Sequence, residues 1–169
     1  MSFRRNVDIR LSTESLESAI REVREMRKEL VQCCKDLVRA LTDDGVTIAK
    51  MNVMSMNAVY TGALEESIRG VFRVSTGTGI IFTDVPYALY VEFGTGIVGE
   101  KNAHDGDTEI EWEYDIHDHG DSGWVYYSDT DGNKRFRWTK GMPARPYMYN
   151  TLRWLEQNAP VKAREIFRL

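Results

Sequence analysis

The chain has 169 residues, a net charge of -4, and 42% apolar and 28% charged side chains. These values fit one globular domain, residues 1–169, with a sizeable core, and they provide no overall positive charge for holding nucleic acid or an anionic membrane. The first residues show no signal-sequence pattern, and no apolar run approaches membrane-spanning length. We therefore expect a soluble protein made in the cytoplasm.

A long amphipathic helix is the strongest pattern in the chain. It follows a short strand predicted by apolar alternation from Phe3 to Leu11, and Ser12 or Thr13 supplies its N-cap. Apolar side chains then repeat every seven residues in two series: Leu16, Val23, Leu30, Leu37, and Ala19, Met26, Cys33, Ala40. A coiled coil fits this repeat, but a helix lying across a sheet is favoured because alanine and cysteine make a thin zipper seam.

Adjacent Cys33 and Cys34 lie inside this helix, which excludes a structural disulfide framework and predicts two small apolar packing residues. The letters TDDG at residues 42–45 predict a break or kink, and a methionine-rich piece follows. Further on, Thr61 is a predicted N-cap for a helical turn, TGALEESI. Two β-rich runs around residues 76–79 then predict a hairpin, which makes the first Gly-Thr-Gly-Ile a turn.

A second Gly-Thr-Gly-Ile ends the stretch PYALYVEFGTGI. Pro86 fits the first position of a short helix, and Gly94 fits its left-handed C′ position. The glycines thus follow a helix, whereas a phosphate site needs them before one, where free N–H groups point outward. Phosphate binding is therefore disfavoured.

Residues 98–141 are interpreted as a β-rich insertion. Residues 109–116, EIEWEYDI, alternate strictly and predict a strand with one aromatic and one acidic face. Two β-prone runs around Asp131-Gly132 predict a hairpin. Its return strand carries Lys134, Arg135 and Arg137, which would face the acidic side chains if the two strands are neighbours.

The last helix is predicted from about Pro146, with Pro160 either kinking it or starting another. Its predicted apolar stripe is Tyr149, Leu152, Leu155, Ala159. The expected fold class is α+β, with the long N-terminal helix and a C-terminal helix packed on a small, mostly antiparallel sheet.

The segments TGALEESI, PYALYVEFGTG and WTKGMPARPYMYNTL together resemble the head–tail joining (neck, tail-completion or "tail component") proteins of lambdoid-type tailed bacteriophages and prophages. The residues that carry the resemblance are Tyr90, Val91, Glu92, Phe93, Gly94, Thr95, Gly96, Ala144, Arg145 and Pro146. The long stretch between Gly96 and Met142 departs from the short form of the family.

This resemblance implies a non-enzymatic virion protein without a cofactor. It implies a homo-oligomeric ring, expected to be hexameric, that joins the head-completion or connector proteins to the tail tube or tail terminator. DNA would pass through as cargo, and no membrane would be involved. The location implied is the neck of the virion.

A charge-assisted pair between Glu92 and Arg145 is a separate hypothesis, since each residue precedes a helix boundary in the two halves of the motif. Two unrelated surface charges are the alternative.

A metal-binding protein or metal-dependent hydrolase is the alternative function. His104 and a cluster of Asp115, His117 and His119 lie in one window, and the last three would share one strand face. An ordinary polar turn explains the same letters. Residues 129–133 begin like a calcium loop, but Lys140 stands where the bidentate glutamate belongs, so a hairpin turn is preferred. A nucleic-acid stacking surface on the hairpin aromatics is disfavoured by the acidic segment nearby.

Overall fold

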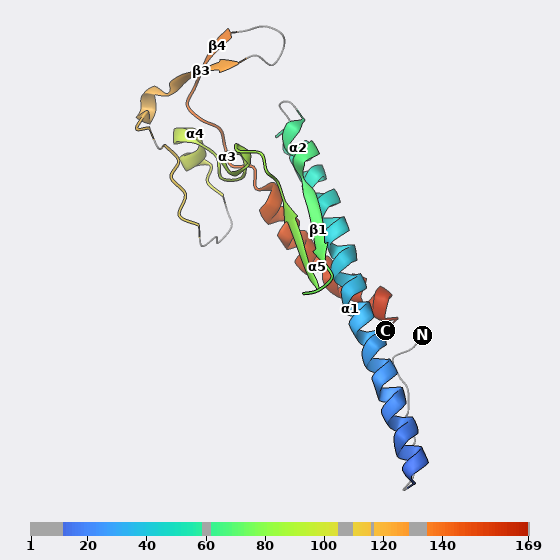
Figure 1. Cartoon of the computed structure of the whole chain (residues 1–169). Helices are drawn as coiled ribbons and strands as arrows, with labels where there is room; N and C mark the ends of the chain where they lie inside the picture. Colours follow the sequence, from blue (N-terminus) through green and yellow to red (C-terminus); the bar gives the residue numbers. More distant parts are fainter. Residues whose placement is uncertain (1–11, 59–61, 105–109, 116, 129–134, 169) are drawn as a thin grey trace.

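The computed structural model describes residues 12–58, 62–104, 110–115, 117–128 and 135–168, and its fold is α+β. Two long helices pack against each other, a β-hairpin lies beside them, and short helices with a second hairpin lie at one end (Figure 1). The predicted class is confirmed, with the sheet taking the form of two separate antiparallel hairpins. The strand predicted at residues 3–11 lies outside the described residues.

Helix α1 runs without interruption over Thr13–Ser55, so the predicted break at residues 42–45 is wrong. Ser12 is the N-cap, as expected, and its Oγ accepts a hydrogen bond from the Ser15 N–H at 3.3 Å. The methionine-rich piece forms the last turns of the same helix. At about 1.5 Å per residue, α1 spans roughly 65 Å, which is far longer than a single small core requires.

Gly45 belongs to the helix because of what packs against it. A Cβ atom at this position would lie 3.1 Å from Leu155 Cδ1 and would overlap the side chain of Ile81. The absent side chain therefore lets both neighbours approach the helix backbone, and their packing offsets the low helix propensity of glycine.

The second half of α1 packs on α5 (Tyr147–Phe167) and on the first hairpin. These elements, residues 38–58, 62–85 and 147–168, are called the waist. Its core consists of buried residues from several elements: Ala49, Val53, Ala58, Leu64, Ile68, and Tyr147, joined by Ala88 and Val91. Asn52 Nδ2 donates to Tyr147 O at 3.2 Å and to Thr151 Oγ1 at 3.1 Å, which fixes how α5 meets α1.

Helix α5 begins where it was predicted, after Pro146, and continues through Pro160. Its buried face differs from the predicted stripe: Tyr147 and Thr151 are buried, whereas Leu152 is exposed. The contact with α1 decides which face is covered, and the polar Thr151 is satisfied there by hydrogen bonds to Asn52 and to Tyr147 O.

The first hairpin pairs β1 (Arg69–Arg73) with antiparallel β2 (Thr78–Phe82), in a register from Arg69 opposite Phe82 to Arg73 opposite Thr78. This confirms the predicted hairpin, but its turn lies at residues 74–77 rather than 76–79, so only Gly77 of the first Gly-Thr-Gly-Ile is in it, with a φ of +66. The hairpin lies close on α1, since a Cβ at Gly70 would come within 2.9 Å of Thr42 Cγ2.

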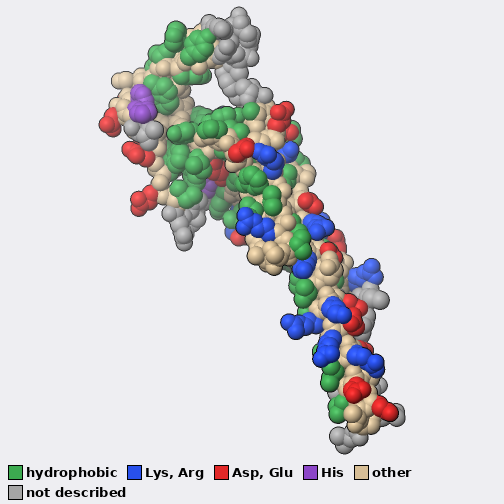
Figure 2. Space-filling model, in the orientation of Figure 1, with side chains coloured by type: hydrophobic (Ala, Val, Ile, Leu, Met, Phe, Trp, Pro, Cys, Tyr) green, Lys and Arg blue, Asp and Glu red, His purple; other side chains and the backbone are tan. Residues whose placement is uncertain are grey.

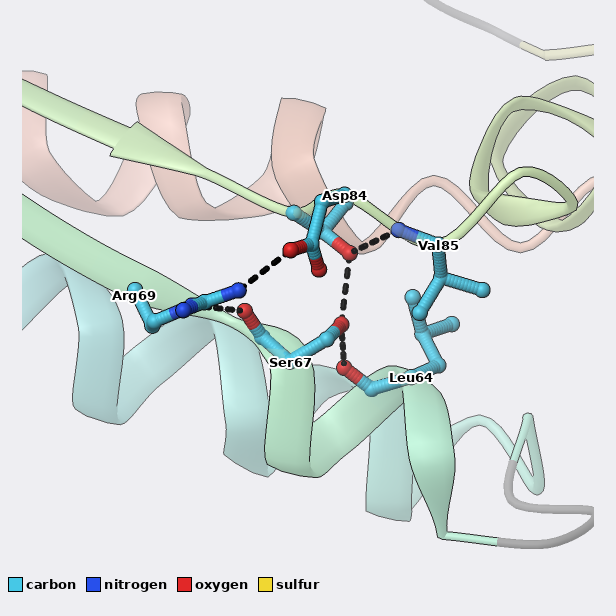
Figure 3. Close-up of polar contacts among 6 residues, drawn as sticks. Leu64, Ser67, Arg69, Asp84 and Val85 are labelled. Atoms are coloured by element: carbon cyan, nitrogen blue, oxygen red, sulfur yellow. Dashed lines mark hydrogen bonds and ion pairs between the residues drawn. The ribbon is translucent and has the colours of Figure 1, made fainter.

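The short helix α2 (Ala63–Ser67) leads into this hairpin. Gly62 is its N-cap, and Thr61 lies outside the described residues. Ser67 Oγ donates to Leu64 O at 2.8 Å and is 2.6 Å from Thr83 Oγ1, and Thr83 Oγ1 also accepts from the Val85 N–H (Figure 3). An Arg69–Asp84 ion pair closes the open end of the hairpin beside them.

The first half of α1, residues 13–37, projects beyond α5 and the hairpin and is called the arm (Figure 1). One series of its apolar side chains remains exposed, Val23 by 55%, whereas Ala19 is only 7% exposed. Cys33 is partly covered and Cys34 is exposed, so the expectation that both thiols pack in a core fails for Cys34. The predicted helix-on-sheet packing therefore applies to the second half of α1 only.

At the opposite end lie α3 (Ala88–Phe93), α4 (Gly96–Lys101), the 3-10 turn η1 (Gly120–Ser122), β3 (Trp124–Ser128) and β4 (Arg135–Thr139). The described residues of 86–146 are called the lobe. The strands β3 and β4 pair antiparallel, so the second predicted hairpin is confirmed, although its turn at 129–134 lies outside the described residues. Helix α3 begins at Ala88, two residues after Pro86.

The predicted acidic strand is wrong for the described residues 110–115, which are irregular. Their alternation has another cause: Trp112 and Tyr114 turn toward the short helices. Trp112 Nε1 donates to Gly94 O at 2.9 Å, and Tyr114 O accepts from the Gly96 N–H at 2.6 Å. Strand β4 pairs with β3, so its arginines do not face an acidic strand.

Candidate functional site: the junction of two motifs

Two segments that are distant in sequence meet in the lobe: residues 90–96 and residues 142–146. They are called the motif junction. Thr95 and Met142 form a β-bridge, with Thr95 N donating to Met142 O at 2.9 Å and Met142 N donating to Thr95 O at 3.1 Å. Arg145 N also donates to Val91 O at 2.8 Å. All ten residues that carry the family resemblance thus belong to one structural unit.

Gly94 makes this close approach possible. Its φ is +83, and a Cβ would lie 2.8 Å from both Ala144 N and Met142 O. Any other residue would be strained and would also push the two segments apart. The predicted C-terminal role of Gly94 is confirmed, since its N–H donates to Tyr90 O at 2.9 Å, but its ψ of 174 is extended rather than left-handed helical.

Glu92 is the central polar residue of the junction, and it is only 6% exposed. Its Oε2 accepts from Met148 N and its Oε1 accepts from Tyr149 N, each at 2.9 Å. These are the second and third N–H groups of α5, which have no partner inside the helix. Glu92 therefore caps α5 from α3, where its charge also interacts favourably with the helix dipole.

The environment of Glu92 acts on its acidity in two directions. Burial raises its pKa above the ordinary value, and the two backbone hydrogen bonds and His104 oppose this increase. His104 Nε2 lies 3.5 Å from Glu92 Oε1, with its ring between Phe93 and Tyr149. Burial and the nearby Glu92 charge raise the pKa of Tyr147 as well.

The hypothesised Glu92–Arg145 pair is wrong. Both Glu92 oxygens face the start of α5, while Arg145 Nη1 lies 3.8 Å from Met142 Sδ. The physical reason is that the first N–H groups of α5 are buried and have no acceptor inside the helix, so they need the Glu92 carboxylate. The Arg145 guanidinium is half-exposed and does not depend on that carboxylate. Glu92 does join two helix ends, as the hypothesis required, but through the backbone.

Aromatic residues surround the junction. Phe93 is buried and stacks on Trp112 with ring centroids 5.1 Å apart, and Tyr90 meets the same indole edge-on at 5.5 Å. The sequence reasoning missed the role of His104 and Trp112 here. The strict alternation around Trp112 was the available signal, and it indicated a buried aromatic face without indicating its partner.

The second Gly-Thr-Gly-Ile differs from its prediction in one respect, because Gly96 also opens α4. Its amides are nevertheless used inside the chain: Gly96 N donates to Tyr114 O, and Val98 N donates to Lys140 O at 3.2 Å. The glycines therefore bring backbone segments together, and this use of the amides leaves little for a phosphate.

The residues proposed for a metal, Asp115, His117 and His119, border an open hollow of about 290 Å³ with Tyr90, Tyr114 and Trp124. His119 Nδ1 is 2.8 Å from Asp115 Oδ1, and Gly120 N donates to Asp115 Oδ2 at 2.7 Å. Hydrogen bonds from the His119 and Gly120 backbone and from the His119 ring lower the Asp115 pKa to about 2.

Asp115 thus holds a tight turn with both of its oxygens. The His117 and His119 rings lie nearly perpendicular with centroids 5.6 Å apart, and they do not share a strand face because that strand is not formed. Among the described residues, no three histidine, cysteine or acidic side chains gather in a metal-binding arrangement. The polar-turn interpretation accounts for these contacts.

No family model, curated protein or solved structure matches the chain. Within the part of the chain that the structure describes, no helix is both long and apolar enough to cross a membrane.

Proposed function

We propose that the protein is a structural component of the neck of a tailed bacteriophage or prophage. In this role it forms a homo-oligomeric ring that joins the DNA-filled head, through its connector proteins, to the tail tube or tail terminator. Such a protein acts by geometry and assembly rather than by catalysis. The motifs of residues 61–68, 86–96 and 138–152 support the proposal through their resemblance to neck proteins.

One observation carries the proposal: the two strongest motif segments form a single buried junction, linked by the Thr95–Met142 bridge and by Glu92 at the start of α5. Motifs that matched by chance would have no reason to meet. The polar groups of this junction are used to hold helix ends, since both Glu92 oxygens are bonded to backbone N–H groups. This favours a structural role for the motif.

Apolar surface exposed at both ends of an elongated molecule also supports an assembly protein. The arm exposes one apolar face and the β3–β4 hairpin exposes another. Exposed apolar patches of this kind mark interaction surfaces in soluble proteins.

Deleting the gene and imaging the resulting particles by negative-stain electron microscopy tests the function. We expect filled heads and separate tails that fail to join, with joining restored by the wild-type gene supplied in trans. A matched pair of rescue variants, Glu92→Ala and exposed Glu165→Ala on α5, should differ, with only the second restoring joined particles. Normal virions in the absence of the protein would overturn the proposal.

A further inference from the structure

An open hollow of about 290 Å³ lies beside the motif junction, and the function proposed above does not use it. Helix α3, the N-cap of α4, the segment that contains Glu113 and His119, and the start of β3 all contribute to its lining. The volume is close to the lower limit for small-molecule sites. The lining combines aromatic rings, carboxylates and imidazoles, which narrows the chemical class of a ligand.

Three aromatic rings border the hollow, and packing holds each of them in place. Tyr90 meets Trp112 edge-on, with ring centroids 5.5 Å apart. A Cβ at Gly96 would lie 2.8 Å from Trp124 Cζ3, so the Trp124 indole lies close against the start of α4. The Tyr114 backbone is fixed by the hydrogen bond from Gly96 N to Tyr114 O at 2.6 Å. The rings are therefore positioned before a ligand arrives, which reduces the entropy cost of binding.

Two carboxylates give the hollow a negative charge. A backbone hydrogen bond from His119, with further hydrogen bonds in the same turn, lowers the pKa of Asp115 to about 2, so this carboxyl is ionised at neutral pH. Glu113 is exposed at the rim. Lysine and arginine do not occur among the described residues that line the hollow. Figure 2 shows acidic and histidine side chains on the outer edge of the lobe, beside apolar ones.

The basic side chains of the β3–β4 hairpin lie outside this lining. Lys140 Nζ is 5.6 Å from the centroid of the Trp138 ring. Trp138 pairs with Val125, so it lies on the opposite face of the hairpin from Trp124. Arg137 shares the hairpin face of Trp124, but it is not among the residues that line the hollow. The charge of the hollow is therefore set by its own acidic groups.

Aromatic rings attract cations through their π electrons, and a neighbouring carboxylate adds to this attraction. We propose that the hollow binds a small organic cation, a guanidinium or alkylammonium group. The rings of Tyr90, Tyr114 and Trp124 contact the planar or methylene part of the ligand, and Glu113 and Asp115 balance its charge. This inference does not depend on the neck function.

Other ligand classes fit the hollow less well. Phosphate and other anions are repelled by its carboxylates. A metal ion needs carboxylate oxygens as ligands, but Asp115 Oδ1 is 2.8 Å from His119 Nδ1 and Asp115 Oδ2 accepts from Gly120 N at 2.7 Å. An organic cation interacts with the charge and with the rings, and it leaves these hydrogen bonds in place.

Fluorine NMR of the full chain labelled with 5-fluorotryptophan tests the site. Capped arginine, N-acetyl-arginine-N′-methylamide, is titrated at pH 8, where histidine is ordinarily neutral. The Trp124 signal, assigned with Trp124→Phe, should shift and saturate with a Kd of about 1–5 mM. The Trp138 signal should stay in place, although this indole is 58% exposed, because it lies outside the hollow. Benzyltrimethylammonium is titrated in the same way as the alkylammonium probe.

Matched controls separate the charge from the shape of the ligand. Capped citrulline has nearly the shape of capped arginine but no charge, and it should bind about tenfold more weakly. Glu113→Gln should weaken the binding of capped arginine about threefold, as expected for one exposed charge. Glu111→Gln removes an exposed acid that does not line the hollow and should leave the affinity unchanged. Both variants are isosteric surface changes, so the fold is preserved.

The order of the two cationic probes identifies the source of the ligand. Tighter binding of capped arginine supports a protein side chain, and tighter binding of benzyltrimethylammonium supports a small quaternary ammonium ion. The inference is overturned if neither probe shifts the Trp124 signal at about 20 mM, or if capped citrulline binds as well as capped arginine. A Trp138 shift as large as that of Trp124, or equal losses in the two glutamate variants, also overturns it, since either result indicates unspecific surface binding.

Discussion

The two halves of α1 belong to one uninterrupted helix and both carry apolar side chains, yet they have different environments. In the waist, Val53 is fully buried against α5 and the surrounding core. In the arm, Val23 belongs to the seven-residue series of apolar side chains and remains 55% exposed. An apolar stripe therefore predicts that a helix will be covered, but it does not say whether the cover comes from the same chain or from another.

The largest loss of unfolding free energy is expected in the core of the waist, at the start of α5. Tyr147→Ala removes a buried ring and should lower the free energy of unfolding by about 3–5 kcal/mol. Tyr147 is 1% exposed. Tyr127→Ala in the exposed hairpin face is the matched control, and it should change stability of the isolated chain by about 0.5 kcal/mol or less. Urea unfolding measures both, and equal effects would contradict the division into waist and lobe.

The link between waist and lobe is the next target. Glu92→Ala leaves two buried N–H groups of α5 without an acceptor, and it should cost about 2–3 kcal/mol of unfolding free energy. Arg145→Ala removes the side chain that does not contact Glu92 and should cost much less. Thermal or urea unfolding of both variants measures the two changes. A larger loss of unfolding free energy for Arg145→Ala than for Glu92→Ala would support the Glu92–Arg145 ion pair instead.

The two halves of α1 can be compared directly with the same substitution. Val53→Ala should destabilise the chain by about 2 kcal/mol, from the buried methyl groups that it removes. Val23→Ala should stay within about 0.5 kcal/mol at concentrations where the chain is monomeric. Similar losses at the two positions would mean that the arm is covered within a single copy.

Glu92 should also give stability a defined pH dependence. Its pKa is raised in the folded chain by burial, so the folded state holds that proton more tightly than the unfolded state. The associated stability is complete below the ordinary value of 4.5 and is lost as pH rises through the folded pKa. Glu92→Gln, which is neutral at every pH, should lack this loss, and urea midpoints of the two proteins across pH 4–7 measure the difference.

The smallest effect is expected at Asp115 in the lobe. Its lowered pKa means that its contribution is present above pH 3.8 and is lost as pH falls through about 2. A carboxyl titration followed by NMR should give a midpoint near 2 for Asp115. His119→Gln should move the midpoint upward, and His117→Gln should leave it in place, because only His119 bonds the carboxylate. An Asp115 midpoint near 3.8 in the wild type would contradict the hydrogen bonds from His119 and Gly120 to the Asp115 carboxylate.

Local patterns predicted the elements of this fold well where local forces decide them. The Ser12 cap, both hairpins and the start of α5 were all predicted from the sequence, because capping, turn chemistry and proline geometry act within a few residues. For the candidate site, the sequence identified the motif residues but not the contacts that they make. Neither the capping of α5 by Glu92 nor the stacking of Trp112 on Phe93 has a local signature.

The errors share one cause. Gly45 was read as a break because glycine is a poor helix former, yet Ile81 and Leu155, distant in sequence, need the space that it leaves. The strict alternation of residues 110–115 predicted a strand, but Trp112 and Tyr114 face the short helices. The Tyr114 carbonyl accepts its hydrogen bond from Gly96, not from a neighbouring strand. The sequence by itself determined the helices, the turns and the amphipathic faces, because these depend on neighbouring residues. Only the tertiary structure decided which face is covered and which carboxylate caps which helix, because those choices depend on groups that meet across the fold.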